Sequence, residues 1–276
     1  MLIGKILIVG YNMTNLVMGV AVGYTVEQLE PFVLSLRKHY KDECVLFVDM
    51  NDNSVVSFLE ENDVLPIPMP PQLREHVQIC NERHKVYRDF LKSNFKDVDR
   101  ILICDVRDVI FQDDPFKHER KADIEFFTES ELIKNDECNG PWWMGGTYGD
   151  DVLQELGDKP IVCAGTTIGT RSGMMMYLNK LIEELDKMIA YNGPERQKTR
   201  PVVDQVCHNY LIHTGKFDNY ILYENGYGPI ATMSFEKECY FNTYFDMLNK
   251  DLTIPAVIHQ WDRTRHQDIF LKKATS

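Results

Sequence analysis

The segment from residue 100 to residue 116 constrains the fold more than any other part of the sequence. It reads RILICDVRDVIFQDDPF, and the apolar run over 101–104 predicts a buried strand. Asp105 and Asp108 follow this strand, and a second apolar run over 109–111 comes before the turn at Pro115. Ligands of α/β proteins bind at the carboxyl ends of buried strands. The segment therefore predicts an α/β protein with a carboxylate site at a strand end.

Two neighbouring carboxylates repel each other unless a cation joins them. Their hard oxygen donors suit Mg²⁺ or Mn²⁺, and these ions usually accompany a phosphate group. The first interpretation of Asp105 and Asp108 is therefore a site for a metal ion and a diphosphate. The alternative is a strand end followed by an acidic turn. The strand before the acids and the apolar run after them favour the functional interpretation.

The rest of the chain fits the α/β class. Thr25 and Gln28 form a capping-box pattern at the start of a helix, in which Pro31 marks either the first turn or a kink. Strands alternate with helices up to residue 116, which predicts a Rossmann-like, mostly parallel sheet with flanking helices. We expect strands over 2–10, 16–22, 45–48, 101–104, 124–127, 160–169, 220–223 and 256–259, helices over 82–94, 173–190 and 202–213, and loops over 66–71, 135–151 and 192–200.

Composition excludes several classes of function. The formal net charge of −12 argues against nucleic-acid binding and against charge-driven adhesion to anionic membranes. The sequence has no apolar stretch of about 20 residues, so we expect no transmembrane segment. Its seven cysteines are scattered without a C-x-x-C pair. This pattern predicts reduced thiols in a cytosolic protein and argues against a zinc site.

His259 and several basic residues are candidates to complete the site. His259 ends the predicted strand 256–259, where an imidazole can join the carboxylates as a third ligand of Mn²⁺. A histidine hydrogen-bonded at a strand end is the alternative. Arg83, Arg107 and Arg263 are expected to neutralise diphosphate charge, and Arg107 and Arg263 each flank a candidate ligand. Further candidates are Lys85, Arg88 and Arg171.

Three other groups carry a functional and a structural interpretation each. Gly165 and Thr166 open a GTTIG run that either brings backbone close to a ligand or makes a tight turn. Trp142 and Trp143 lie in a polar, Gly-rich segment, where they either stack on a sugar or anchor the segment in the core. Asp204 begins the helix 202–213, either as a cap or as a base that takes a proton from an acceptor hydroxyl.

Four segments together resemble the nucleotide-sugar glycosyltransferases of the GT-A fold: 103–116, 162–169, 203–205 and 258–263. The resemblance implies a single domain over 1–276, with a nucleotide-binding half (1–116), an acceptor-binding half (117–276) and a smaller sheet on the acceptor side. It implies that Asp105, Asp108 and His259 hold Mn²⁺ or Mg²⁺ on the diphosphate of a UDP-sugar. It also implies that residues 163–169 face the transferred sugar.

The acidic motif departs from the usual D-x-D of that family, because residue 107 is an arginine. We expect Asp108 to bind the metal directly, and Asp105 to reach the metal through water or to bind the ribose. Besides Asp105, the residues expected to bind the nucleotide-sugar are Arg83, Arg107, Arg263, Gly165 and Thr166.

The expected activity is transfer of xylose, glucose or galactose to a hydroxyl of an oligosaccharide or glycoprotein glycan, with Asp204 as the base if the enzyme inverts the sugar. The chain is most similar to soluble transferases of bacteria or large algal viruses, which implies a cytoplasmic location, in the host if viral. A non-catalytic nucleotide- or glycan-binding protein is an alternative. A sugar-nucleotide pyrophosphorylase is another, although residues 10–15 lack its Gly-rich phosphate loop. Donor sugar, acceptor, stereochemistry and oligomeric state remain open at this stage.

Overall fold

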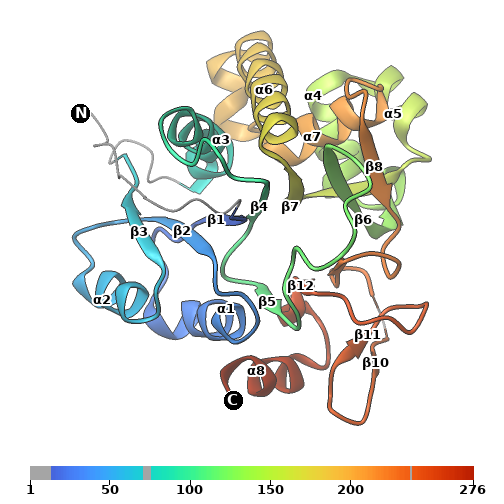
Figure 1. Ribbon diagram of the computed structural model, residues 1–276. Helices are drawn as coiled ribbons and strands as arrows, with labels where there is room; N and C mark the ends of the chain where they lie inside the picture. The colour runs from blue at the N-terminus through green and yellow to red at the C-terminus, as the bar shows by residue number, and fades with distance from the viewer. Residues whose placement is uncertain (1–13, 71–75, 237) are drawn as a thin grey trace.

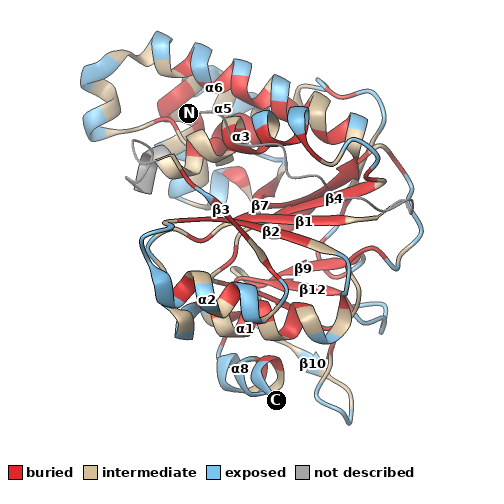
Figure 2. Cartoon of the chain, turned by 60° about the vertical axis from the view of Figure 1, so that its left-hand side comes forward, coloured by how far each residue is buried: buried red, intermediate tan, exposed pale blue. Residues whose placement is uncertain are grey.

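The computed structural model describes residues 14–70, 76–236 and 238–276. A seven-stranded sheet lies between two layers of helices, with α1 and α2 on one face and α3 and α6 on the other (Figure 1). Figure 2 shows the buried strands β1, β2, β4 and β7 between these layers, whose outer surfaces are exposed. The α/β class predicted from the sequence is confirmed.

The central sheet has the order β3-β2-β1-β4-β7-β6-β8. It is mixed: β7 runs antiparallel to both of its neighbours, β4 and β6, whereas the other neighbouring pairs are parallel. Strands from both predicted halves of the chain therefore pair in one sheet. The strands are β3 (Leu65–Pro68), β2 (Glu43–Val48), β1 (Leu16–Val20), β4 (Arg100–Cys104), β7 (Pro160–Thr170), β6 (Ile124–Leu132) and β8 (Tyr220–Tyr223).

Alternation along each strand explains the two layers. In β4, Ile101 and Ile103 pack into the core beneath α3 and α6, whereas Leu102 and Cys104 pack into the core over α1 and α2. Both sets of side chains are almost fully buried, as expected of a strand covered by helices on both faces. The helices are α1 (Val26–His39), α2 (Asn53–Glu61), α3 (His76–Ser93), α4 (Gly146–Tyr148), α5 (Asp150–Leu156), α6 (Arg171–Thr199), α7 (Asp204–His213) and α8 (Gln267–Thr275).

A three-stranded sheet brings β12, near the end of the chain, beside β5, which follows β4 of the central sheet. Its order is β5-β12-β9, with β5 (Val109–Phe111), β12 (Val257–His259) and β9 (Ile230–Thr232). Its apolar residues, among them Ile110 and Ile258, pack with Phe270 of α8. A hairpin of β10 (Tyr240–Phe241) and β11 (Met247–Leu248) lies beside it.

The predicted loop over 66–71 is wrong in its first half, because β3 covers Leu65–Pro68. Pro66 and Pro68 lack the backbone N–H of a strand residue. β3 tolerates them because it is the edge strand of the sheet and pairs with β2 alone. The predicted strand over 2–10 lies outside the described residues.

Two other predicted loops are largely helical. Between 135 and 151 the chain forms η3 (Cys138–Gly145), a π-helix, followed by α4 and α5. The Asp136 side chain accepts a hydrogen bond from the Asn139 N–H at 2.7 Å and so caps its start. Gly149, with φ of 99°, makes the break between α4 and α5. The short turns η2 (Ile133–Asn135) and η4 (Trp261–Arg263) complete the described elements.

The predicted loop over 192–200 continues α6 as far as Thr199. Gly193, with φ of 71° and ψ of 166°, interrupts the helix in a conformation that only glycine adopts readily. Pro194 then begins the second segment, where its missing N–H costs no hydrogen bond. The glycine and proline that predict a loop here only kink a helix.

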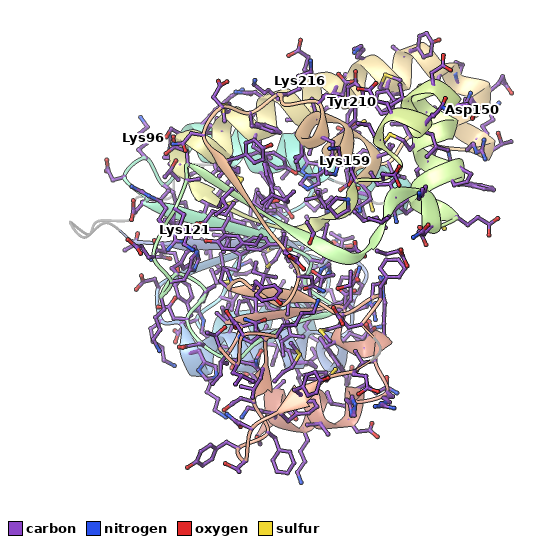
Figure 3. All side chains as sticks on the ribbon, turned by 90° about the vertical axis from the view of Figure 1, so that its right-hand side faces the viewer. Lys96, Lys121, Asp150, Lys159, Tyr210 and Lys216 are labelled. Atoms are coloured by element: carbon purple, nitrogen blue, oxygen red, sulfur yellow. The ribbon has the colours of Figure 1, made fainter. Side chains whose placement is uncertain are left out.

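Exposed charged side chains such as Lys96, Lys121 and Asp150 lie along the outside of the molecule (Figure 3). Within the described residues no helix combines the length and the apolar character needed to cross a membrane. All seven cysteines are free thiols.

Candidate metal centre

A cavity of about 690 Å³ opens at the carboxyl ends of β1 and β4. These strands are neighbours, but from β1 the chain first adds β2 and β3 on one side of β1 and then returns to add β4 on its other side. Such a point of reversal leaves a crevice, which is where α/β proteins bind ligands. Gly23 and Tyr24, after β1, line one wall, and Asp105, Arg107 and Asp108, after β4, line another.

Strand pairing brings three predicted ligands together from distant parts of the chain. β12 pairs antiparallel with β5, which sets His259 opposite Val109. Asp108 directly precedes Val109, and its carbonyl accepts a hydrogen bond from the Gln260 N–H at 2.7 Å. Asp105 follows β4 on the same loop. The sequence prediction that these residues meet is therefore matched by the geometry, and Asp105, Asp108 and His259 are called the carboxylate triad below.

The spacing of the carboxylate triad fits a divalent cation. One ligand atom from each residue lies within 4.8 Å of the others. His259 Nε2 lies 3.4 Å from Asp105 Oδ2 and 3.6 Å from Asp108 Oδ1, and it is buried without a hydrogen-bond partner among the described residues. Ligands about 2.1 Å from an octahedral ion lie roughly 3 to 4 Å apart. The three residues thus fit Mn²⁺ or Mg²⁺.

Charge in the carboxylate triad also favours a cation. Burial by itself would lower the pKa of His259, but Cys163, Asp108 and Asp105 beside the ring raise it well above its usual value. Burial likewise opposes ionisation of Asp105, but Arg83 and His259 lower the pKa of its carboxyl group. Asp105 therefore remains charged, and positive charge is favoured beside it.

Gly165 leaves room for the carboxylate triad. Its carbonyl accepts a hydrogen bond from the Asp105 N–H at 2.8 Å, because β7 runs beside β4. A Cβ atom at this position would lie 2.5 Å from His259 Cε1 and 2.6 Å from Asp105 Oδ2. No side chain fits there without moving a ligand. On the same strand, Cys163 Sγ lies 3.4 Å from His259 Nδ1 and so meets the ring on its other nitrogen.

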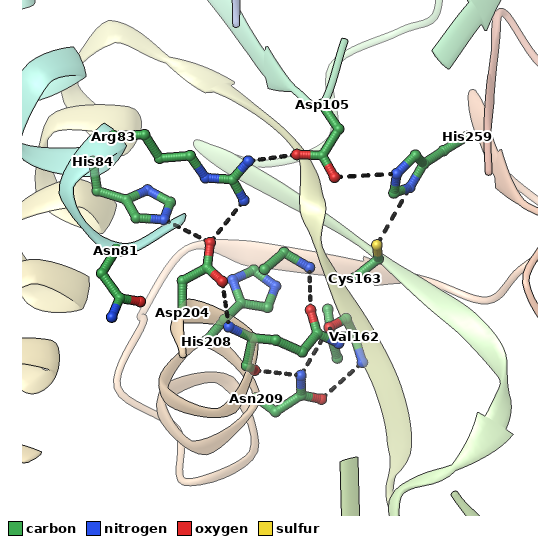
Figure 4. Close-up of polar contacts among 12 residues, drawn as sticks. Asn81, Arg83, His84, Asp105, Val162, Cys163, Asp204, His208, Asn209 and His259 are labelled. Atoms are coloured by element: carbon green, nitrogen blue, oxygen red, sulfur yellow. Dashed lines mark hydrogen bonds and ion pairs between the residues drawn. The ribbon is translucent and has the colours of Figure 1, made fainter. Parts of the chain in front are cut away.

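Arg83 joins the carboxylate triad to Asp204 (Figure 4). It extends from α3 and ion-pairs with Asp105 through Nη1 and with Asp204 Oδ2 through Nη2, the latter at 2.7 Å. His84 Nε2 lies 3.0 Å from the same oxygen of Asp204. The other oxygen, Oδ1, accepts a hydrogen bond from the Gln205 N–H at 2.9 Å. Burial would raise the pKa of Asp204, but Arg83 and His84 lower it.

Arg107 and Arg263 lie on the other side of the carboxylate triad. Arg107 Nη1 donates to Asp262 Oδ2 at 2.6 Å, and its Nη2 lies 3.6 Å from Asp108 Oδ2. Arg263 Nη2 lies 3.7 Å from the same oxygen of Asp108. All three predicted arginines line the cavity. In an acidic chain, this local gathering of guanidinium groups matches the needs of a bound diphosphate.

Other predicted residues lie elsewhere. Thr166 is fully buried and does not line the cavity. Trp143 lines it, whereas Trp142 is 45% exposed beneath the guanidinium of Arg200. The further basic candidates lie away from the cavity: Lys85 pairs with Glu82 and Asp186, Arg88 pairs with Asp89, and Arg171 donates to the carbonyls of Leu91 and Phe95.

Several residues of the cavity were not predicted from the sequence. Tyr24 extends its wall beyond β1, and Glu129 of β6 lines it as a buried acid. Gln205 accepts a hydrogen bond from the Ala164 N–H at 2.8 Å and so fixes the start of α7 against β7. The one signal for Glu129 is an acid at the end of the apolar run over 124–127; Tyr24 and Gln205 have none without the fold.

Comparison of the sequence with models of protein families gives no match. Comparison with curated proteins gives none either. The geometry itself supports a site for a divalent cation with arginines on two sides, inside a cavity large enough for a small organic ligand.

Proposed function

We propose that this protein is a metal-dependent glycosyltransferase that moves a sugar from a UDP-sugar to a hydroxyl of a glycan acceptor. The observation that carries the proposal is the meeting of the carboxylate triad with Arg83, Arg107 and Arg263 in one cavity at the reversal point of the sheet. The donor sugars that fit the family resemblance are xylose, glucose and galactose.

Different residues of the cavity would bind different parts of a charged donor. The carboxylate triad would hold Mn²⁺ or Mg²⁺, which stabilises the negative charge of a leaving diphosphate. Arg107 and Arg263 lie beside Asp108, where they can bind the phosphate oxygens. Tyr24 and Gly23 line the β1 end of the cavity and offer an aromatic ring to the nucleoside.

Asp204 is the predicted base for an inverting reaction, and that role stays a prediction. Both of its oxygens already accept hydrogen bonds, and its pKa is lowered. A carboxylate held in this way binds a proton weakly and keeps its position firmly. Its surroundings favour the other role open to it, which is to orient Arg83 and the sugar bound beside it.

Calorimetry with UDP tests the metal dependence directly. In the presence of Mn²⁺ we expect binding, and after chelation with EDTA we expect binding to be almost lost, because the donor diphosphate then faces Asp105 and Asp108 without a cation. UDP affinity that is unchanged by EDTA would contradict the metal assignment.

Metal-dependent hydrolysis of a panel of UDP-sugars then separates an enzyme from a binding protein. We expect slow release of UDP from one or two donors, since an activated sugar in a transferase site also reacts with water. Tight UDP binding with no turnover of any donor or acceptor would favour a non-catalytic nucleotide-binding protein.

A further inference from the structure

Glu129 is a buried acid in the wall of the cavity. It belongs to β6, is 7% exposed and lines the same cavity as the carboxylate triad. The pairing of β6 with β7 shifts register on both sides of Thr128, between Phe126 and Thr128 and between Thr128 and Leu132. Irregularities of this kind redirect a side chain and are frequent beside active sites.

Glu129 differs in its surroundings from Asp105 and Asp204, the two acids with which Arg83 pairs. Among the described residues, no lysine or arginine nitrogen lies within 4.0 Å of its carboxylate. The Cys163 thiol, which lies beside His259, also acts to lower the pKa of Glu129. A buried carboxylate with no lysine or arginine at ion-pair distance is costly to keep, and such groups concentrate at functional sites.

The groups that act on the pKa of Glu129 come from three elements and from the short link between η2 and η3. Burial raises its pKa, while His259 on β12, Cys163 on β7 and Arg263 on η4 oppose that rise and Asp136 adds to it. Arg83 and His84 hold the carboxylate of Asp204, whereas among the described residues no lysine or arginine pairs with Glu129, so the Glu129 carboxylate is better placed to take up a proton.

We propose that Glu129 is the general base of the transfer reaction and that the reaction inverts the anomeric carbon. This inference rests on the proposed function. The acceptor hydroxyl loses its proton to the Glu129 carboxylate as its oxygen bonds to C1 of the donor sugar. The bond from C1 to the diphosphate oxygen breaks at the same time, and its electron pair leaves with UDP towards the carboxylate triad and the arginines.

The test replaces Glu129 by Gln, which keeps the size of the side chain but cannot take the proton. We expect the transfer rate to fall by about 10²- to 10⁴-fold while Mn²⁺-dependent UDP binding is kept. Glu131→Gln, two residues along β6 and half-buried, is the matched control and is expected to transfer at the wild-type rate. A Glu129→Gln variant that stays folded and transfers normally would overturn the inference.

A second measurement does not depend on any variant. Nuclear magnetic resonance of the first product formed by the wild-type protein is expected to show inversion at C1, and retention would overturn the inference. A rate loss in Asp204→Asn together with normal transfer by Glu129→Gln would return the base role to Asp204. Wild-type protein that neither binds UDP with Mn²⁺ nor transfers sugar would overturn the proposed function as well, whereas the preceding outcomes overturn the inference alone.

Discussion

Two of the clusters in which carboxylate and imidazole groups meet differ in how closely these groups approach each other. In one, Glu125 Oε2 accepts hydrogen bonds from His118 Nε2 at 2.7 Å and from Arg100 Nη2 at 3.1 Å. The Arg100 and Glu125 side chains are almost fully buried. In the carboxylate triad, two acids share one imidazole at 3.4 and 3.6 Å, and the cluster opens into the cavity.

The comparison separates a structural ion pair from a ligand set. In the first cluster one acid is satisfied by two donors at hydrogen-bond distance, so nothing further is needed. Within the carboxylate triad the imidazole lies farther from both acids than a hydrogen bond, and His259 Nε2 has no hydrogen-bond partner among the described residues. We therefore expect a divalent cation in the second cluster and none in the first.

The largest expected effect comes from removing one charge of the carboxylate triad. Asp108→Asn keeps the size of the side chain, and we expect Mn²⁺-dependent UDP binding to weaken by about 100-fold or more, since changing even an outer partner of a metal site costs about 10- to 100-fold. Calorimetry with UDP and Mn²⁺ measures this, and thermal unfolding shows whether the variant stays folded.

Asp113→Asn is the control for that variant. Asp113 follows β5 in the same segment and pairs with Lys117 on the surface, at 2.7 Å. We expect its loss to leave UDP binding unchanged. If Asp108→Asn bound UDP as tightly as the wild type, the carboxylate triad would have to be read as a second structural cluster.

A smaller effect is expected from crowding the carboxylate triad without altering its charge. Gly165→Ala places a methyl group 2.5 Å from His259 Cε1, so a ligand must move and UDP binding in Mn²⁺ should weaken by about 10- to 100-fold. Gly169→Ala on the same strand meets the Asp123 carbonyl at 2.9 Å, away from the cavity. Both variants should be less stable. Equal UDP affinity in the two would show that Gly165 does not matter to the site.

The residues of the site that lie at strand ends could be predicted from the sequence. Asp105, Asp108 and His259 each follow or end an apolar run. Asp105 lies at the carboxyl end of β4, and the antiparallel pairing of β5 with β12 brings Asp108 and His259 together beside it. Gly165 could be predicted as a point of close backbone approach because glycine has no side chain. The α/β class followed from the alternation of strands and helices.

The contacts that depend on helix orientation and on irregular backbone could not be predicted, even between residues that the sequence singles out separately. Arg83 and Asp204 lie 121 residues apart on different helices, and nothing local links them. Glu129 enters the cavity where the pairing of β6 shifts register, which periodicity cannot anticipate. Glycine and proline predict loops over 135–151 and 192–200, but here they mark breaks between helical segments.

The last prediction concerns the cluster of Glu125, His118 and Arg100. A change in this cluster should leave UDP binding unchanged. Burial alone would raise the pKa of Glu125, but His118 and Arg100 lower it. A lowered pKa contributes stability that is complete above the unfolded value of about 4.3 and is lost as the pH falls through the lower folded value. Glu125→Gln should therefore lower the free energy of unfolding at neutral pH by about 1 to 3 kcal/mol, since it removes hydrogen bonds to a charged group.

The same variant should also lose part of its acid sensitivity, because Gln does not titrate. Denaturant unfolding at pH 7 and at pH values below about 4 measures both effects, with the exposed Glu119→Gln as control. A Glu125→Gln variant as stable as the wild type at pH 7 would mean that the buried ion pair contributes nothing. If its UDP affinity fell as far as that of Asp108→Asn, the two clusters would be coupled, and the division between a structural ion pair and a ligand set would fail.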